Sequence, residues 1–310
     1  MKKMFSVFIS MLILIFFTSS VAFAGSVNDG IKTIKVTEYD LYRQLISKTD
    51  EELKNQGLND EQIKELRNFD FNKVFLERAK LSNHELKKMG YTDEQIFKLK
   101  SLYGQTKNNK QVESKIETQN IYAELYNSGI FANLEITTWL ISGSDTSITV
   151  GFSWRWSNLP AYYGGRDAIA VIWQGTNTNG QPINVSIDTS SSYHKVQETN
   201  TNSALNGKVT NLAFEVEDYY HSAKSEFQLG YRIEDMIGWY QNGWGAIKVN
   251  RTGTHFIKEV AMKISYGHTY ILISPGVSFS PISFSIGFAW NCTNMDTENA
   301  IYSKNVKRTP

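Results

Sequence analysis

Two glutamates are spaced for acid–base chemistry in the run Phe214-Glu215-Val216-Glu217-Asp218. In an extended strand the side chains of Glu215 and Glu217 point to the same face. A pair of carboxylates flanking a sugar bond is the usual machinery of a glycosidase. Alternation with apolar neighbours also explains the run as the solvated face of a half-buried strand, which is the simpler interpretation. A polysaccharide hydrolase or lyase using Glu215 and Glu217 stays an alternative.

The histidines and the single cysteine match no catalytic or metal-binding motif. The sequence contains no HExxH, no nucleophile elbow, no Gly-rich phosphate loop and no calcium loop. Cys292 has no partner for an intramolecular disulfide and continues the alternation of the strand around Trp290. We therefore expect packed or solvated side chains, no cofactor and no metal. The five histidines are His84, His194, His221, His255 and His268.

Aromatic residues beside glycine and amide residues are the remaining chemical signal. The segments 162–165 and 239–244 read as Gly-containing turns, in which strand alternation does not explain why rings would be buried. Aromatic faces stack on the apolar C–H faces of sugars, and neighbouring amides bond their hydroxyls. The sequence therefore predicts a ligand-binding platform at one end of a β domain. Its expected residues are Tyr162, Tyr163, Trp239, Tyr240 and Trp244.

The N-terminus has the pattern of a secretory signal peptide over residues 1–24. Two lysines precede an apolar run over 4–17, and Ala22-Phe23-Ala24 is a small-residue cleavage site. We expect a secreted protein, extracellular or associated with the cell surface, with no transmembrane helix after the cleavage site. The formal net charge of +1 argues against a nucleic-acid partner.

The elements that would carry these residues divide into two kinds, of which the first is helical. Thr49–Ile63 recurs 33 positions later as Ser82–Ile96. Each copy predicts two short helices with Ser, Thr or Asn caps answered by Glu or Gln three positions on. Gly57 or Gly90 separates the two helices in the left-handed conformation.

A small helical repeat domain is therefore expected over residues 25–103, with two copies of a helix-turn-helix unit. Its polar lead Gly25–Lys35 precedes a helix over Val36–Ser47, and a connecting helix spans Phe69–Lys80. Residues 104–130 follow as a polar linker, most polar over Gly104–Gln119.

The hydrophobic period changes from 3.6 to 2 after Phe131, which predicts an all-β domain over residues 131–303 and a tail over 304–310. The hairpin Leu134–Trp156 is its clearest element. Many short strands with turn signals between them are typical of an antiparallel sandwich or jelly roll. Further strands are expected at Ala168–Trp173, Ile183–Ile187, Leu212–Glu217, Phe227–Ile233, Trp244–Val249, Phe256–Tyr266, Tyr270–Ile273 and Val277–Asn291.

The fold class expected is thus α+β in two segregated domains. The function that fits best is a secreted, non-enzymatic binding protein whose β-sandwich recognises an extracellular glycan or cell-wall polymer. One alternative is a membrane-active protein of the pore-forming type, because the hairpin Leu134–Trp156 and the strand pair Val277–Trp290 alternate apolar residues with Ser and Thr. The second alternative is the hydrolase or lyase described above.

Overall fold

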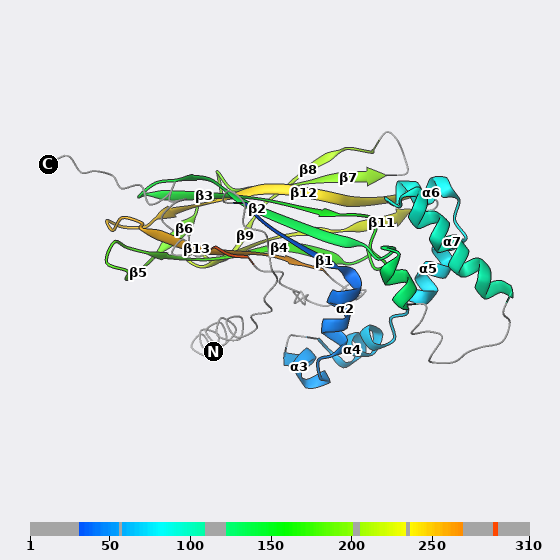
Figure 1. Ribbon diagram of the computed structural model, residues 1–310. Coiled ribbons are helices and arrows are strands. Elements are labelled where there is room, and N and C mark those ends of the chain that lie inside the picture. Colours follow the sequence, from blue (N-terminus) through cyan, green and yellow to red (C-terminus); the bar gives the residue numbers. More distant parts are fainter. Residues whose placement is uncertain are drawn as a thin grey trace.

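The computed structural model describes residues 31–55, 58–108, 122–200, 205–233, 236–268 and 288–290. Within these residues, helices occupy the N-terminal part of the chain and antiparallel sheets the C-terminal part, so that the fold is α+β (Figure 1). No described helix is long and apolar enough to cross a membrane. Several expected features lie outside the described residues: the signal peptide, Gly57, the strand Tyr270–Ile273, Cys292 and the tail.

The helices are short and lie toward one end of the sheets (Figure 1). Residues 122–127 are also helical and precede the first long strand. The first five residues of the expected linker, 104–108, continue a helix instead, because nothing at Gly104 breaks it. The helices are α2 (Glu38–Ile46), α3 (Asp50–Asn55), α4 (Asp60–Arg67), α5 (Phe71–Ala79), α6 (Asn83–Lys88) and α7 (Asp93–Asn108).

The expected capping boxes are confirmed at the starts of α4 and α6. Asn59 accepts from the amide of Gln62 at 2.9 Å, and Gln62 accepts in return from the amide of Asn59 at 3.0 Å. At the start of α6, the Ser82 hydroxyl accepts from the amide of Glu85 at 3.2 Å, and the Glu85 carboxylate accepts from the amide of Ser82 at 2.7 Å. These bonds satisfy amide groups that a helix start otherwise leaves without partners. Gly90 adopts the left-handed conformation expected of it, with φ of 88°.

The strands form two antiparallel sheets, which we call sheet A and sheet B. Sheet A runs in the order β1 (Ile31–Thr37), β2 (Asn133–Gly143), β3 (Ser147–Trp156), β12 (Met236–Arg251), β7 (Tyr193–Asn200) and β8 (Val209–Leu212), and β6 (Val185–Ile187) and β11 (Gly230–Ile233) also pair with β12. Sheet B runs in the order β14 (Phe288–Trp290), β13 (Glu259–Gly267), β4 (Arg166–Thr176), β10 (Ser222–Gln228) and β9 (Glu215–Asp218), and β5 (Pro182–Ile183) pairs with β4.

The hairpin expected at Leu134–Trp156 is confirmed as β2 and β3. The expectation of a polar lead over Gly25–Lys35 is wrong for its last residues, because Ile31–Thr37 form β1 and pair with β2. Ile34 lies opposite Ile136, so that β1 adds an apolar residue to the core side of the sheet. The helix expected from Val36 accordingly begins at Glu38, where Thr37 caps it by accepting from the amide of Asp40.

The two sheets face each other across an aromatic core. Trp154 of sheet A stacks on Phe227 of sheet B with ring centres 5.2 Å apart, and contacts Tyr266 edge-on at 5.1 Å. Between them, His194 accepts from the indole N–H of Trp154 at 3.1 Å and contacts the Ser225 hydroxyl at 3.0 Å. Burial lowers the pKa of His194 to about 3, so that the imidazole is neutral.

Candidate functional site

The expected turn over residues 239–243 is wrong, because these residues lie within the long strand β12. The turn was predicted because the segment contains glycines. In the structure they make room for rings: Gly243 lies under Trp154, and Gly238 lies against Tyr231. A one-residue irregularity between Tyr240 and Asn242 accommodates the extra length of β12 against β7.

The expected platform residues do not share one exposed face. Trp239 is only 1% exposed. Tyr240 is half-buried and packs edge-on against Phe227 in the sandwich core, with ring centres 6.1 Å apart. Tyr162 packs in the same manner on Phe69 of the helical part, at 5.9 Å.

Tyr163 and Trp244 complete that set. Tyr163 lies against Gly230, beside the buried Trp239. The segments 157–165 and 229–241 are therefore neighbours, and the Leu229 amide donates to the Gly165 carbonyl. Trp244 lies elsewhere, on the side of sheet A that faces away from sheet B. We call that side the outer face.

Strand register brings a row of residues together on the outer face. Residues directly opposite one another in antiparallel strands project to the same side. One such row crosses five strands and carries rings at two of its positions, with small residues between them. Its members, in order across the sheet, are Ile31, Trp139, Gly151, Ala246 and Tyr193.

The indole ring of Trp139 lies over Gly151, its neighbour on β3. Its indole ring occupies the position that a Cβ on Gly151 would take. Trp139 is half-buried on this floor, whereas Tyr193 is 42% exposed. Gly151 lies under the Trp139 indole and Ala246 is buried, so that the row presents the rings of Trp139 and Tyr193 to its surroundings.

The next two rows of the outer face are mostly polar and contain one further aromatic ring, that of Trp244. Trp244 lies between Ser153 and Lys195. One register step further along β12, Asn242 lies between Arg155 and Gln197. Hydroxyl, amide and cationic side chains therefore surround Trp244, which is half-buried. Sequence analysis missed Trp139 and Tyr193, although the position of Trp139 on the polar side of its strand was a signal.

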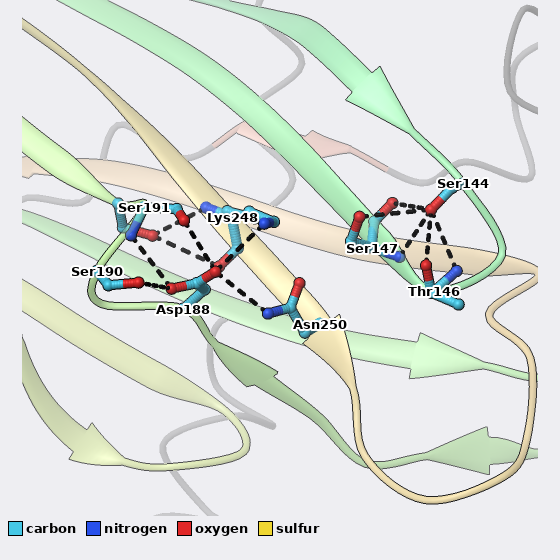
Figure 2. A network of polar contacts seen from close by, with 9 residues as sticks. Ser144, Thr146, Ser147, Asp188, Ser190, Ser191, Lys248 and Asn250 are labelled. Carbon is cyan, nitrogen blue, oxygen red and sulfur yellow. Dashed lines mark hydrogen bonds and ion pairs between the residues drawn. The ribbon is translucent and has the colours of Figure 1, made fainter.

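Figure 2 shows the polar network at the end of the outer face where β6 turns into β7. The Asp188 carboxylate accepts from the hydroxyls of Ser190 at 2.6 Å and Ser191 at 2.9 Å, and pairs with Lys248 at 3.2 Å. Asn250 donates to it as well, at 3.3 Å. These donors hold the pKa of Asp188 well below its usual range. A carboxylate so fully satisfied fixes a turn and is not available as a base.

A second turn in Figure 2 closes the hairpin of β2 and β3. The Ser144 hydroxyl accepts from the amides of Thr146 at 3.2 Å and Ser147 at 3.0 Å. Such bonds from a hydroxyl to the following backbone are the ordinary way in which serine stabilises a turn. Both turns lie beside the end of β12, and the hydroxyls drawn in them bond within each turn (Figure 2).

Buried proton-transfer groups meet in the sandwich, beneath the helices. Asp167 accepts from the Tyr266 hydroxyl at 2.5 Å and contacts the Nδ1 atom of His268 at 3.0 Å. Tyr266 in turn accepts from the indole N–H of Trp156 at 3.0 Å. All of these side chains are at most 1% exposed, so that a substrate could not reach them without the core opening.

Two further buried ionisable side chains, Glu38 and Arg78, lie at the junction between the helices and the sandwich. Glu38 accepts from the amides of Ala161 at 2.6 Å and Ala132 at 3.3 Å. Arg78 donates to the carbonyls of Leu159 at 2.7 Å and Pro160 at 2.5 Å. Burial raises the pKa of Glu38 to about 7, although the charge of Arg78 opposes the shift. The arrangement anchors α2 and α5 to the β3–β4 loop.

The two glutamates of the enzymatic alternative lie at the edge of sheet B. Glu215 and Glu217 are both exposed on β9. Glu217 pairs with Lys224 of the neighbouring strand at 3.0 Å. Across the described ranges, no group of three or more His, Cys, Asp or Glu side chains could hold a metal ion.

Comparison with known proteins adds little. No family model matches the chain, and no curated protein matches it. A solved structure described as AvmM, which catalyses macrocyclization in alchivemycin A biosynthesis, is similar over 50% of this chain and 87% of its own. The two share 10% sequence identity, and the TM-score is 0.23, which is too low to indicate a common fold.

Proposed function

We propose that the protein is a secreted, non-enzymatic binding protein whose β-sandwich recognises an extracellular glycan or cell-wall polymer. The observation that carries the proposal is the outer face of sheet A, where Trp139, Trp244 and Tyr193 are set among hydroxyl and amide side chains. Of the residues expected from the sequence, only Trp244 belongs to this face.

The dimensions of the face suit an extended polymer. The backbone positions of Trp139 and Tyr193 are separated by three strand spacings, which is about 14 Å. Since Gly151 lies under the Trp139 indole and Ala246 is buried, a sugar chain that crosses these strands would have the two rings beneath its apolar faces. The amides of Asn242 and Gln197 lie four residues further along the strands, about 13 Å from this row, and would donate to hydroxyls of a chain that also passes over Trp244.

The alternatives have weaker support. The hairpin of β2 and β3 has one face buried against sheet B, so that a membrane-inserting form would first have to give up that packing. Glu215 and Glu217 are both exposed on the edge strand β9, where water has access to their carboxylates. The duplicated helix-turn-helix unit and the separation into two domains stay predictions, in which the helical part serves as a spacer, a docking element or a pro-region.

Retention on insoluble polysaccharides tests the proposal. We expect the purified protein to be retained by at least one polymer of a panel of cell-wall and plant polysaccharides, without release of reducing ends. Tyr193→Ala should weaken retention, because a stacked ring contributes about 1 kcal/mol or more to binding.

Tyr219→Ala is the matched control. Tyr219 is 56% exposed but lies after β9, at the edge of sheet B, so that its loss should leave retention unchanged. Equal weakening by both variants, or retention by no polymer of the panel, would contradict the proposal. Release of reducing ends would support the hydrolase, and leakage of liposomes the membrane-active protein.

A further inference from the structure

The charged side chains of the outer face are unequal in number. Projecting on this side from β1, β2, β3, β12 and β7, among the side chains that the structure describes, are four cations, Lys35, Arg155, Lys195 and Lys248, and one anion, Glu135. Asp188, from the turn before β7, adds a second anion at the edge of the face.

Both anions already have a lysine partner. Glu135 pairs with Lys35 at 3.1 Å, and Asp188 pairs with Lys248 at 3.2 Å. No ion pair joins Arg155 or Lys195 to an acidic side chain within the described residues, although Glu135 lies opposite Arg155 on the neighbouring strand. The face therefore carries a surplus of positive charge, and this surplus is located at Arg155 and Lys195.

These two cations flank the ring of Trp244. Lys195 lies directly opposite Trp244 on β7. Arg155 lies on β3, on the other side of β12, opposite Asn242. The two positions are thus separated by two strand spacings and one register step, which is about 10 Å across the sheet and about 7 Å along it.

We propose that the ligand of the outer face is an acidic polysaccharide that carries carboxylates, an inference that rests on the proposed function. Two single charges so far apart fit a polymer with one negative charge per repeat better than one compact, multiply charged group. Arg155 offers the planar pair of donors that matches a carboxylate, and Lys195 offers a point charge to a second one. Trp244 stacks on the sugar ring between them.

Polymers that share a backbone and differ in charge provide the test. We expect affinity electrophoresis to show stronger retardation by polygalacturonate than by its methyl-esterified form, and by carboxymethylcellulose than by hydroxyethylcellulose. The advantage should shrink as ionic strength rises, because exposed charges are screened. Arg155→Gln and Lys195→Gln should each weaken binding of the acidic polymer about twofold to fivefold.

Lys64→Gln is the control, because it removes one exposed positive charge from α4, on the helical part of the chain. Circular dichroism melting should show all three variants folded. Equal binding of the charged and neutral polymers, with no effect of Arg155→Gln, would overturn the inference and leave glycan binding intact. Binding of none of the four polymers, together with none of the wider panel, would remove the proposed function itself.

Discussion

Gly151 determines what the outer face of sheet A looks like at the scale of a single residue. Any larger residue there would displace the indole of Trp139, whose ring fills the space of the missing side chain. The same strand pairing places Ala246 next to Gly151, and Ala246 is buried as well. The small side chains at these two positions thus let the Trp139 ring lie close to the sheet.

Gly90 is a glycine required for two reasons. Its φ is 88°, which disfavours any other residue, and a Cβ there would lie 2.9 Å from the backbone atoms Asn158 Cα and Ser157 O. We expect Gly90→Ala to lower the free energy of unfolding by about 2–4 kcal/mol, from backbone strain and overpacking together. Urea denaturation of the full chain measures the change.

Gly104 gives the opposite expectation. It lies within α7 with no atom within 4 Å of an added Cβ, so that Gly104→Ala should stabilise the helix by about 0.5–1 kcal/mol. Two glycines in one helical part would then differ in the sign of the same substitution. An unchanged unfolding curve for Gly90→Ala would show that the close approach to Asn158 is wrong.

At the scale of elements, the junction of α2 with the sandwich depends on Glu38. Its carboxylate sits where the chain leaves β1 and enters α2, and it holds the amides of Ala132 and Ala161. In the folded protein its pKa is about 7, above the usual value of 4.5. The folded state therefore keeps a proton that the unfolded chain releases.

The sign of the pH dependence follows from this raised pKa. Between pH 4.5 and about 7 the free energy of unfolding should fall as pH rises, since proton binding favours the folded state in that window. The Glu38 contribution is at most about 3 kcal/mol. Urea titrations from pH 4 to pH 8 should show this slope in the wild type and a reduced slope in Glu38→Gln. Identical slopes would mean that Glu38 is not responsible.

Local sequence signals predicted some elements and misled about others. The capping boxes at Asn59 and Ser82 depend on residues three positions apart, and the structure has them. Strand β1 was not predicted, because the residues Ile31–Thr37 are recognised as a strand only from their pairing with β2. The predicted strand Leu212–Glu217 is instead divided between β8 in sheet A and β9 in sheet B.

The candidate binding face illustrates the same limit. Trp244 could be selected from its type and neighbours, but the rows that join it to Lys195 and Trp139 depend on register across four strands. Register follows from long-range pairing, which a single sequence does not specify. For the same reason Trp239 was expected in a solvent-facing turn and lies in the core.

At the scale of the whole molecule, the helices and the sheets contact each other directly and are not joined by a linker alone. One hydrophobic cluster runs from Leu41 and Phe75 in the helices through Phe131, which precedes β2, to Trp156 in sheet A. The Leu159 amide donates to the Met89 carbonyl, and Arg78 bonds the same loop from α5. Figure 1 shows the helices gathered at one end of the two sheets.

The most direct measurement compares Trp244→Ala with Trp154→Ala for both stability and binding. Trp154 is 1% exposed and stacks on Phe227, so that its loss should cost about 3–5 kcal/mol of unfolding free energy through the cavity it leaves. Trp244 lies on the outer face, and its loss should cost little stability but weaken binding of the retained polymer at least about fivefold. Isothermal titration and urea denaturation of both variants would provide the four values. If Trp244→Ala destabilises the protein as severely as Trp154→Ala, or binds the polymer as tightly as the wild type, the outer face is not the binding site.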